Sequence, residues 1–379
     1  MKKLIRVTTS DISLDLLLKG QLRYLNQYYE VVGVSSNTGL LADVAKREGV
    51  RVVELSMRRE ISIRRDLACL WHLIRLFRKE KPFIVHANTP KASLLSMMAA
   101  WIVRVPHRIY TVTGLRYQGM TGHGRTILKT TERMTCLFAN KVIPEGEGVK
   151  RTLTTDCITQ KPLEVIHYGN INGIDTSFFS PAAVRISKNE ERNKLNIGEN
   201  DFTFVFVGRI VRDKGMDELA VAMRQLISNG YHCKLILVGW LEKELNTINE
   251  YNEHFFKYSD AVRYVGYKKD VRPFLLTADA LVFPSYREGF PQVVMEAGAM
   301  GLPSIVTDIN GCNEIIVEGE NGVIIPPKDS NALFSAMKSF MESPQEVSRM
   351  AKNARRMIQQ RYEHNDVMKE LLKMYQKLA

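Results

Sequence analysis

The sequence predicts an α/β protein of two doubly wound domains, each built on a largely parallel sheet. Short apolar runs rich in β-branched residues alternate with helical patterns along the chain, which is typical of strands buried on both faces. The length of 379 residues suits two domains of ordinary size. Charge also divides the chain. Up to Asp175 there are 27 Lys and Arg against 15 Asp and Glu, whereas the remainder has 26 of each.

Composition narrows the classes of function. The five cysteines lie far apart, without a Cys-x-x-Cys or a histidine at zinc-ligand spacing, which predicts a reducing compartment, no disulfide framework and no metal site. The apolar run at the N-terminus is too short and interrupted for a signal peptide, and the run 94–103 is about half of a membrane span. We therefore expect a soluble or peripheral protein of the cytoplasm. The basic first half suggests an anionic partner such as nucleic acid, a membrane surface or a phosphorylated substrate.

The first half begins with a strand in LIRVTT. Ser10 and Asp11 follow it as capping residues, and leucines then recur at helical spacing over residues 14–25. YEVVGVSS and VRVVELSM predict the second and third strands.

The most basic stretch of the chain is MRREISIRRDLACLWHLIRLFRKEKP. Its apolar positions recur at helical spacing over residues 67–77, with more basic residues near the other side. The arginines that precede this helix are Arg58, Arg59, Arg64 and Arg65. The pattern favours a helix that packs on its sheet with a basic outer face, and an interfacial membrane helix is the alternative.

FIVHANTPKASLL predicts a strand, a loop and a helix. Asn88 and Thr89 occupy the cap, and Lys91 lies in the first turn, where a phosphate could bind. His86 at the strand end is a candidate substrate ligand or a positioned structural group. RIYTVTGL is the next strand, and Thr113 at its end can donate a hydroxyl.

The second half alternates strand and helix, and its first loop carries cations. FTFVFVGRIVRDKGMDELAVAM predicts a strand, a loop and a helix, with Gly208, Arg209 and Lys214 in the loop. Two cations at the carboxyl end of a strand suit a diphosphate, because doubly wound sheets bind ligands at that edge.

The stretch 280–303 combines two carboxylates with a helix start. ADALVFPS predicts a buried strand that ends at Pro284, and VVMEAGAM predicts a helix whose small residues pack on that strand. The backbone N–H groups near 290–293 then lie at a helix N-terminus, which favours an anion. Glu288 and Glu296 flank this position. Carboxylates are pure acceptors, so they suit the hydroxyls of a sugar.

These motifs together resemble a known family. The segments PSYREGFP, EAGAMGLPSIVTDINGCNEII and NGVIIPP, with Gly208-Arg209 and Lys214-Gly215, are similar to the retaining glycosyltransferases of family 4 with the GT-B fold, in which two Rossmann-like domains face each other across a cleft. The family signature is Glu, seven residues, Glu, and Glu288 to Glu296 matches it. Ser and Asp after the first strand, where many members have a Gly-rich turn, resemble the branch that assembles bacterial capsule and O-antigen repeat units.

The resemblance implies roles for particular residues. It implies that Glu288 is catalytic through its contact with the donor sugar and that Glu296 binds the nucleotide ribose. The other donor-binding positions implied are Gly208, Arg209, Lys214, Val265, Tyr267, Phe290, Pro291, Gln292 and Val293. The expected acceptor-binding positions are Ser10, Asp11, His86, Asn88, Lys91 and Thr113. Relatives often carry His where this chain has Thr113, which removes the most obvious imidazole.

The domains expected from these patterns are an acceptor-binding domain over residues 1–178 and a nucleotide-sugar-binding domain over 179–361, with a helix at about 362–379 packing back on the first. The function implied is transfer, with retention, of a hexose or N-acetylhexosamine from a nucleotide-sugar, UDP-linked, to a polyprenyl-diphosphate saccharide at the anionic inner face of a bacterial membrane. We expect no cofactor and no metal, because the chain lacks the Asp-x-Asp of the other major glycosyltransferase architecture.

Two alternatives come from other classes. One is an isomerase of the same two-domain type, similar to the UDP-HexNAc 2-epimerases, against which the Glu-x7-Glu pattern speaks. The other is a basic nucleic-acid-binding protein, which only the charge supports. No nucleic-acid-binding module is visible, so we expect no nucleic-acid partner.

Overall fold

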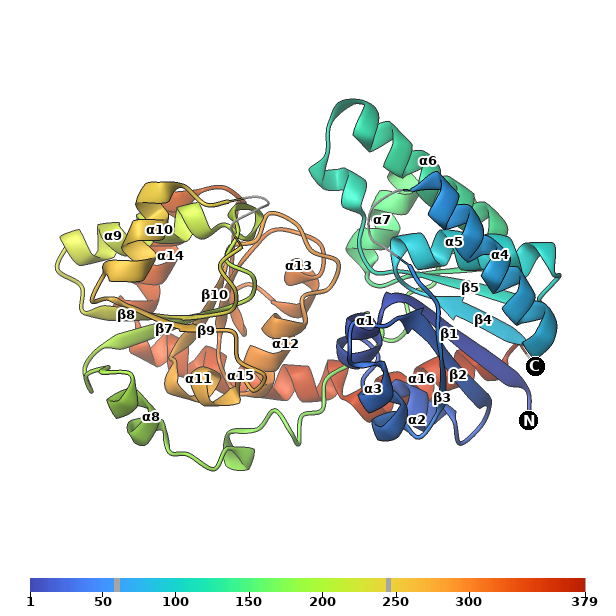
Figure 1. Ribbon diagram of the computed structural model, residues 1–379. Helices are drawn as coiled ribbons and strands as arrows, with labels where there is room; N and C mark the ends of the chain where they lie inside the picture. Colours follow the sequence, from blue (N-terminus) through green and yellow to red (C-terminus); the bar gives the residue numbers. More distant parts are fainter. Residues whose placement is uncertain (58–61, 243–246, 379) are drawn as a thin grey trace. The chain divides into compact units, whose positions relative to one another are not determined.

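The structure, a computed structural model, describes residues 1–57, 62–242 and 247–378. It divides into two compact units, one of residues 1–173 with 364–379 and the other of residues 174–363 (Figure 1). Each unit is built on one six-stranded sheet. The predicted α/β class with two Rossmann-like units is therefore confirmed. The boundary predicted from sequence falls between residues 178 and 179, and the units change between residues 173 and 174.

The sheet of the first unit is parallel throughout, with the strand order β3-β2-β1-β4-β5-β6. Its strands are β1 (Lys3–Ser10), β2 (Glu30–Ser36), β3 (Arg51–Glu54), β4 (Ile84–Ala87), β5 (His107–Val112) and β6 (Lys141–Pro144). The direction in which successive strands are added reverses between β1 and β4. In sheets of this kind, ligands bind beyond the carboxyl ends of the strands at such a reversal.

Helices cover both faces of this sheet, and each face has its own apolar core (Figure 1). The first face carries α1 (Asp11–Leu16), α2 (Gln21–Leu25), α3 (Leu41–Glu48) and the C-terminal α16 (His364–Gln376). The opposite face carries α4 (Ile63–Glu80), α5 (Pro90–Ile102), α6 (Gly122–Phe138) and α7 (Glu147–Thr155). A 3₁₀ turn, η1 (Arg116–Gly119), precedes α6.

The leucine pattern over residues 14–25 forms two short helices instead of the single helix predicted. The break falls at Gly20, whose φ of +80° is a left-handed conformation that favours glycine. The carboxylate of Glu48 accepts hydrogen bonds from the N–H groups of Gly20 (3.0 Å) and Arg23 (3.1 Å) and so caps the second helix. This cap comes from α3, outside residues 14–25, and Leu14, Leu18, Leu22 and Leu25 are buried across the break.

The second unit repeats the same topology. Its strands are β7 (Phe202–Val207), β8 (Cys233–Val238), β9 (Val262–Gly266), β10 (Ala280–Phe283), β11 (Ser304–Thr307) and β12 (Gly322–Ile325). They pair in parallel in the order β12-β11-β10-β7-β8-β9, so the reversal here lies between β7 and β10.

The elements around this second sheet share one continuous core. The helices are α8 (Lys188–Lys194), α9 (Met216–Ser228), α10 (Glu250–Tyr258), α11 (Arg272–Thr277), α12 (Gln292–Ala299), α13 (Cys312–Ile315), α14 (Ser330–Glu342) and α15 (Pro344–Tyr362), with 3₁₀ turns η2 (Pro181–Ala183) and η3 (Arg212–Lys214). The small residues of α12 were predicted to pack on the preceding strand, but Gly298 faces α15. A Cβ at Gly298 would lie 2.7 Å from Cγ1 of Ile358. The small residue thus allows α12 and α15 to pack closely.

Candidate active site

Two loops of the second unit follow the strands that flank its reversal. The loop after β7 runs from Gly208 to Gly215, and the loop after β10 runs from Pro284 to Pro291. Because β7 and β10 are hydrogen-bonded neighbours, the carboxyl ends of these strands bring the two loops together. Residues that are some 75 positions apart in the sequence therefore share one site.

Several hydrogen bonds join the two loops. The N–H of Tyr286 donates to the carbonyl oxygen of Asp213 at 2.9 Å, and Arg287 Nη2 donates to Asp213 Oδ2 at 3.1 Å. The hydroxyl of Tyr286 also donates to the carboxylate of Glu218 in α9, at 2.7 Å and 2.8 Å from its two oxygens. These contacts fix the second loop on the first, so the groups that the loops present keep a defined spacing.

The predicted catalytic carboxylate and a predicted diphosphate-binding cation form an ion pair. Lys214 Nζ donates to Glu288 Oε1, and each of the two side chains is 17% exposed. The hydroxyl of the buried Ser285 donates to the same oxygen at 2.8 Å. Ser285 was not predicted, because a serine after a strand carries no signal of its own. Its hydrogen bond orients Glu288 toward Lys214.

A buried thiol lies beside this pair. Burial is the main cause that raises the pKa of Cys312 well above its usual range, and the negative charge of Glu288 adds to it. A thiol is nucleophilic only as the thiolate. Cys312 is therefore protonated and serves as a packing residue at the start of α13.

Two glycines let the loop backbones approach each other. At Gly215 (φ +71°) a Cβ would lie 2.0 Å from the carbonyl oxygen of Pro284, and at Gly239 (φ +147°) it would lie 1.7 Å from the carbonyl oxygen of Gly208. Both distances exclude any side chain. At these two positions the loops that end β7, β8 and β10 therefore approach each other closely through their backbones.

The other predicted cation, Arg209, is half-exposed and is paired with Glu242 at 2.8 Å. At the ends of the neighbouring strands β8 and β9, the rings of Trp240 and Tyr267 stack in parallel, with centroids 4.3 Å apart and an interplanar angle of 9°. Both rings are more than half exposed, and the predicted Val265 beside them is half-buried. Trp240 was missed from the sequence, although its place directly after Gly239 at a strand end is the signal that would have found it.

The start of α12 presents backbone more than side chains. Phe290 is buried with its ring 5.5 Å from that of Tyr362, so its side chain belongs to the core. Pro291 occupies the N-cap. The half-buried residues of the first turns are Gln292, Val293 and Glu296. The first N–H groups of a helix have no partner within the helix and attract an anion.

In the first unit, Asp11 was expected to bind an acceptor, and the structure gives it a different role. The buried carboxylate accepts from the N–H (2.8 Å) and hydroxyl (2.6 Å) of Thr38 and from the N–H of Leu40 (2.9 Å). Burial alone would raise its pKa, but these hydrogen bonds outweigh burial and lower it. Asp11 thus orders the loop 38–40. Ser10 is also buried and caps α1 by accepting from the N–H of Ile12 at 3.3 Å.

The expectation that His86 points toward a substrate is corrected. Its ring is 2% exposed, with Nδ1 2.5 Å from the hydroxyl of Tyr375 and Nε2 2.7 Å from the hydroxyl of Thr111. Burial, followed by the nearby charge of Arg6, holds the pKa of His86 well below its usual range. The imidazole is neutral and both nitrogens are engaged, so His86 fastens the C-terminal helix α16 to the sheet.

The remaining predicted acceptor residues lie after β4 and β5. Lys91 Nζ is held by Asp66 at 2.8 Å and 3.1 Å, so a phosphate at this helix start would compete with Asp66 for the cation. Thr113 donates its hydroxyl to the carbonyl oxygen of Asn88 at 2.8 Å. Asn88 is 1% exposed, and neither atom of its amide has a hydrogen-bond partner in the described part of the chain. Because a buried amide without partners is costly, Asn88 is the strongest polar candidate in this unit.

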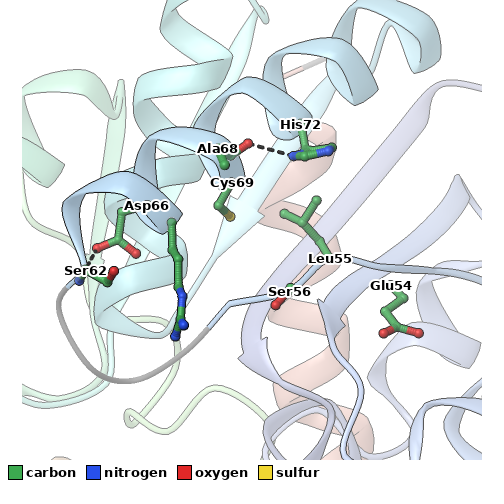
Figure 2. Close-up of a pocket in the computed structure, with 9 residues that line it drawn as sticks. Glu54, Leu55, Ser56, Ser62, Asp66, Ala68, Cys69 and His72 are labelled. Carbon is green, nitrogen blue, oxygen red and sulfur yellow. Dashed lines mark hydrogen bonds between the residues drawn. The ribbon is translucent and has the colours of Figure 1, made fainter.

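A separate cavity of about 420 Å³ lies between the end of β3 and the first turns of α4 (Figure 2). Its lining is formed by Glu54, Leu55, Ser56, Ser62, Arg65, Asp66, Ala68, Cys69 and His72. It lies at the edge strand, two strands away from the reversal at β1 and β4. None of the predicted site residues lines it, and its charges have both signs.

Within residues 1–57, 62–242 and 247–378, no group of three His, Cys, Asp or Glu side chains is arranged to hold a metal ion. None of the helices described there combines the length and the apolar character that crossing a membrane requires.

The chain matches the models of two protein families. Residues 20–178 match "Glycosyltransferase Family 4", and residues 187–357 match "Glycosyl transferases group 1". A capsular polysaccharide biosynthesis glycosyltransferase of Staphylococcus aureus, CapM, is 32% identical over 95% of this chain and 93% of its own length. The UDP-Gal:alpha-D-GlcNAc-diphosphoundecaprenol alpha-1,3-galactosyltransferase of Escherichia coli is 27% identical over 88% of this chain and 85% of its own.

Among solved structures, Alr3699/HepE of Anabaena in complex with UDP superposes with a TM-score of 0.82 over 100% of both chains. The sequence identity is only 18%, so this likeness concerns the fold.

Proposed function

We propose that this chain, which belongs to the glycosyltransferases of family 4, transfers a hexose or N-acetylhexosamine from a UDP-sugar to a saccharide carried on polyprenyl diphosphate. The observation that carries the donor half of this proposal is the pairing of Lys214 with Glu288 where the strand order reverses. The names of the relatives support the rest. One makes capsular polysaccharide, and another uses UDP-Gal and an acceptor on diphosphoundecaprenol.

In the proposed donor complex, the diphosphate lies between the loop after β7 and the start of α12. Lys214, Arg209 and the first amides of α12 would supply the positive charge that stabilises the leaving nucleoside diphosphate. Donors that are fixed before the reaction act strongly on such developing charge. When the diphosphate takes over Lys214, Glu288 is released to accept from hydroxyls of the sugar, and Glu296 would accept from the ribose.

The base would lie against the end of β9, where the backbone from Val265 to Tyr267 can read its edge. The stacked rings of Trp240 and Tyr267 provide an apolar wall next to that backbone. An aromatic face is suited to a flat heterocycle.

We propose that the transfer retains the anomeric configuration by a front-face route. The bond from the anomeric carbon to the phosphate oxygen breaks, the bond to the acceptor oxygen forms on the same face, and the acceptor's proton passes to the departing phosphate oxygen. This route needs no protein nucleophile, which agrees with a protonated Cys312 and with Glu288 held by Lys214 and Ser285. The cations and the helix start take the part that a divalent ion plays elsewhere, so we propose that transfer is metal-independent.

The acceptor half of the proposal rests on the first unit. The amide of Asn88 at the end of β4, which has no hydrogen-bond partner among the described residues, is offered as a contact to the acceptor, with Thr113 holding the backbone beside it. All of the net positive charge lies in this half of the chain, which suits a diphosphate lipid and an anionic membrane surface. We therefore place the protein in the cytoplasm, peripheral on the inner face of the bacterial membrane.

The test is direct transfer with the full chain. UDP-Glc, UDP-Gal, UDP-GlcNAc and UDP-GalNAc are each combined with short-chain polyprenyl diphosphates that carry one sugar, with and without EDTA. The expected product is heavier by one hexose or one N-acetylhexosamine, has the anomeric configuration of the donor by NMR, and forms equally in EDTA. The variant Glu288→Gln, which lacks the proposed catalytic carboxylate, should form this product at least about a hundredfold more slowly.

Two results would contradict the proposal. Conversion of the nucleotide-sugar into its epimer in the absence of any acceptor would favour the isomerase alternative. Absence of transfer together with a gel shift at moderate salt would favour nucleic-acid binding.

A further inference from the structure

We propose that the outward face of α4 is the surface through which this protein contacts an anionic lipid membrane. The inference rests on the proposed function, in which the acceptor is anchored in lipid. It concerns a surface of the first unit that contains none of the predicted donor or acceptor residues.

The helix α4 has two unlike faces. Cys69, Leu73 and Phe77 are buried against the sheet and belong to the core on that side. Other large apolar side chains of the same helix point outward. Leu67 is 60% exposed and Trp71 is 56% exposed. Core packing therefore accounts for one side of the helix and leaves the other side, with its tryptophan, unexplained.

The charges of α4 are sorted in the same way. Its two acidic residues turn inward. Asp66 pairs with Lys91, and Glu80, with a side chain only 7% exposed, pairs with Lys3 (2.7 Å) and Arg51 (2.6 Å). Its cations turn outward, and none of them forms an ion pair among residues 1–57, 62–242 and 247–378. They are Arg64, Arg65, Arg75, Arg78 and Lys79.

The outward cations and apolar residues alternate at helical spacing. Positions 64, 67, 71, 75 and 78 follow one another by three or four residues and so share one side of the helix. The guanidinium of Arg75 lies 5.7 Å from the ring of Trp71. A helix face that combines tryptophan and leucine with basic residues is the composition that lies at a membrane interface, where the rings enter the headgroup layer and the cations meet anionic lipid.

The charge pattern also distinguishes lipid from other occupants. A symmetric dimer through this face would bring its cations, Arg64, Arg75 and Arg78, against the same cations of the second copy, which is repulsive. A nucleic-acid backbone would satisfy the cations, but it would not bury Leu67. Arg58 and Arg59, which are predicted to precede this helix, lie outside the described residues.

The experiment is flotation of the full chain with vesicles of phosphatidylcholine alone or mixed with phosphatidylglycerol. The wild type should float with the mixed vesicles at low salt and should be released as salt rises. The double variant Leu67→Ser, Trp71→Ser should bind the mixed vesicles roughly tenfold more weakly, because it removes apolar area from the interface. The triple variant Arg64→Gln, Arg75→Gln, Arg78→Gln should lose about fivefold for each cation removed.

Trp101→Ser is the matched control. Trp101 is 55% exposed on α5 of the same unit, so the variant removes the same side chain from outside the proposed surface, and its binding should equal that of the wild type. The inference is overturned if the wild type does not float. It is also overturned if the α4 variants float normally, if Trp101→Ser loses as much binding, or if sedimentation shows that α4 mediates self-association.

Transfer assays separate this inference from the proposed function. The α4 variants should glycosylate a short-chain, water-soluble acceptor at the wild-type rate and a long-chain acceptor in vesicles more slowly. That first result also shows that the variants are folded. Transfer to the soluble acceptor without flotation would overturn the membrane surface alone. Flotation that depends on α4, without transfer to either acceptor, would overturn the proposed function alone.

Discussion

The substitution Glu288→Gln should tighten the binding of UDP while it nearly abolishes transfer. In the structure, Glu288 forms an ion pair with Lys214, which is the cation proposed to bind the diphosphate. Both side chains are 17% exposed, so the pair is at the upper end of what surface ion pairs contribute, about 1 kcal/mol. In Glu288→Gln the diphosphate of UDP no longer competes with a carboxylate for Lys214. A gain of about 1 kcal/mol corresponds to an affinity about fivefold higher.

The assay is calorimetric titration of UDP into the wild type, Glu288→Gln and Lys214→Met. The lysine variant loses charge-assisted hydrogen bonds to the diphosphate, so its affinity should fall by about tenfold to a hundredfold. Glu342→Gln is the matched control, because Glu342 pairs with Lys338 on the surface of α14 and the variant should bind UDP normally. Weaker binding of UDP by Glu288→Gln would refute the reasoning, since it would show that the carboxylate supports the diphosphate site instead of competing for its cation.

Three further changes test other parts of the structure. Burial raises the pKa of Glu132 to about 7, so the folded state keeps this proton to a higher pH than the unfolded state, and wild-type stability falls as pH rises from about 4.5 to 7. In urea unfolding, the free energy of unfolding of Glu132→Gln relative to the wild type should therefore increase by about 2 kcal/mol from pH 5 to pH 8, and a constant difference would contradict this. Tyr375→Phe removes the hydroxyl that lies against the buried ring of His86, so the free energy of unfolding by urea should fall by about 1–3 kcal/mol, whereas unchanged stability would argue against the anchoring of α16. Gly239→Ala places a Cβ 1.7 Å from a carbonyl oxygen of the neighbouring loop and should weaken UDP binding in the same titration. Gly230→Ala is the control, because Gly230 also has a positive φ but a Cβ there meets nothing within 4 Å; equal effects of the two variants on UDP binding would contradict the close approach of the loops.

The donor half of the candidate site could be anticipated because its residues lie where local pattern is informative. A residue that follows a buried parallel strand must lie at the carboxyl edge of the sheet, whatever the rest of the fold does. Lys214 after β7 and Glu288 after β10 are such residues. Their roles as ligands of a nucleotide-sugar stay predictions.

The acceptor half was less predictable because its side chains are engaged by partners distant in sequence. Tyr375, which holds His86, is 289 positions further along the chain. Asp11 is held by Thr38 and Lys91 by Asp66, and no pattern around Asp11 or Lys91 reveals those partners. A polar residue at a strand end can equally be a ligand or a fastener, and only its tertiary partners decide between them.

The residues that sequence reasoning missed belong to a third kind. Ser285 carries no periodic signal and no motif, and it becomes noticeable only through the carboxylate of Glu288. Trp240 has the signal of its place after Gly239 at a strand end, but its contact with the ring of Tyr267 appears only in the structure. The break of the first predicted helix at Gly20 has the same origin, because Glu48 of another helix supplies the cap.

The central claim, that the loops after β7 and β10 bind a nucleotide-sugar, is tested most directly by thermal unfolding of the full chain with UDP-, GDP-, ADP- and TDP-sugars. A ligand at about a hundred times its Kd should add about 2.7 kcal/mol to the free energy of unfolding and raise the Tm. We predict that UDP-sugars raise the Tm of the wild type, and that Lys214→Met and Glu296→Ala remove most of that shift. A Tm that no nucleotide-sugar changes at millimolar concentration, or a shift that both variants retain in full, would contradict the donor site described above.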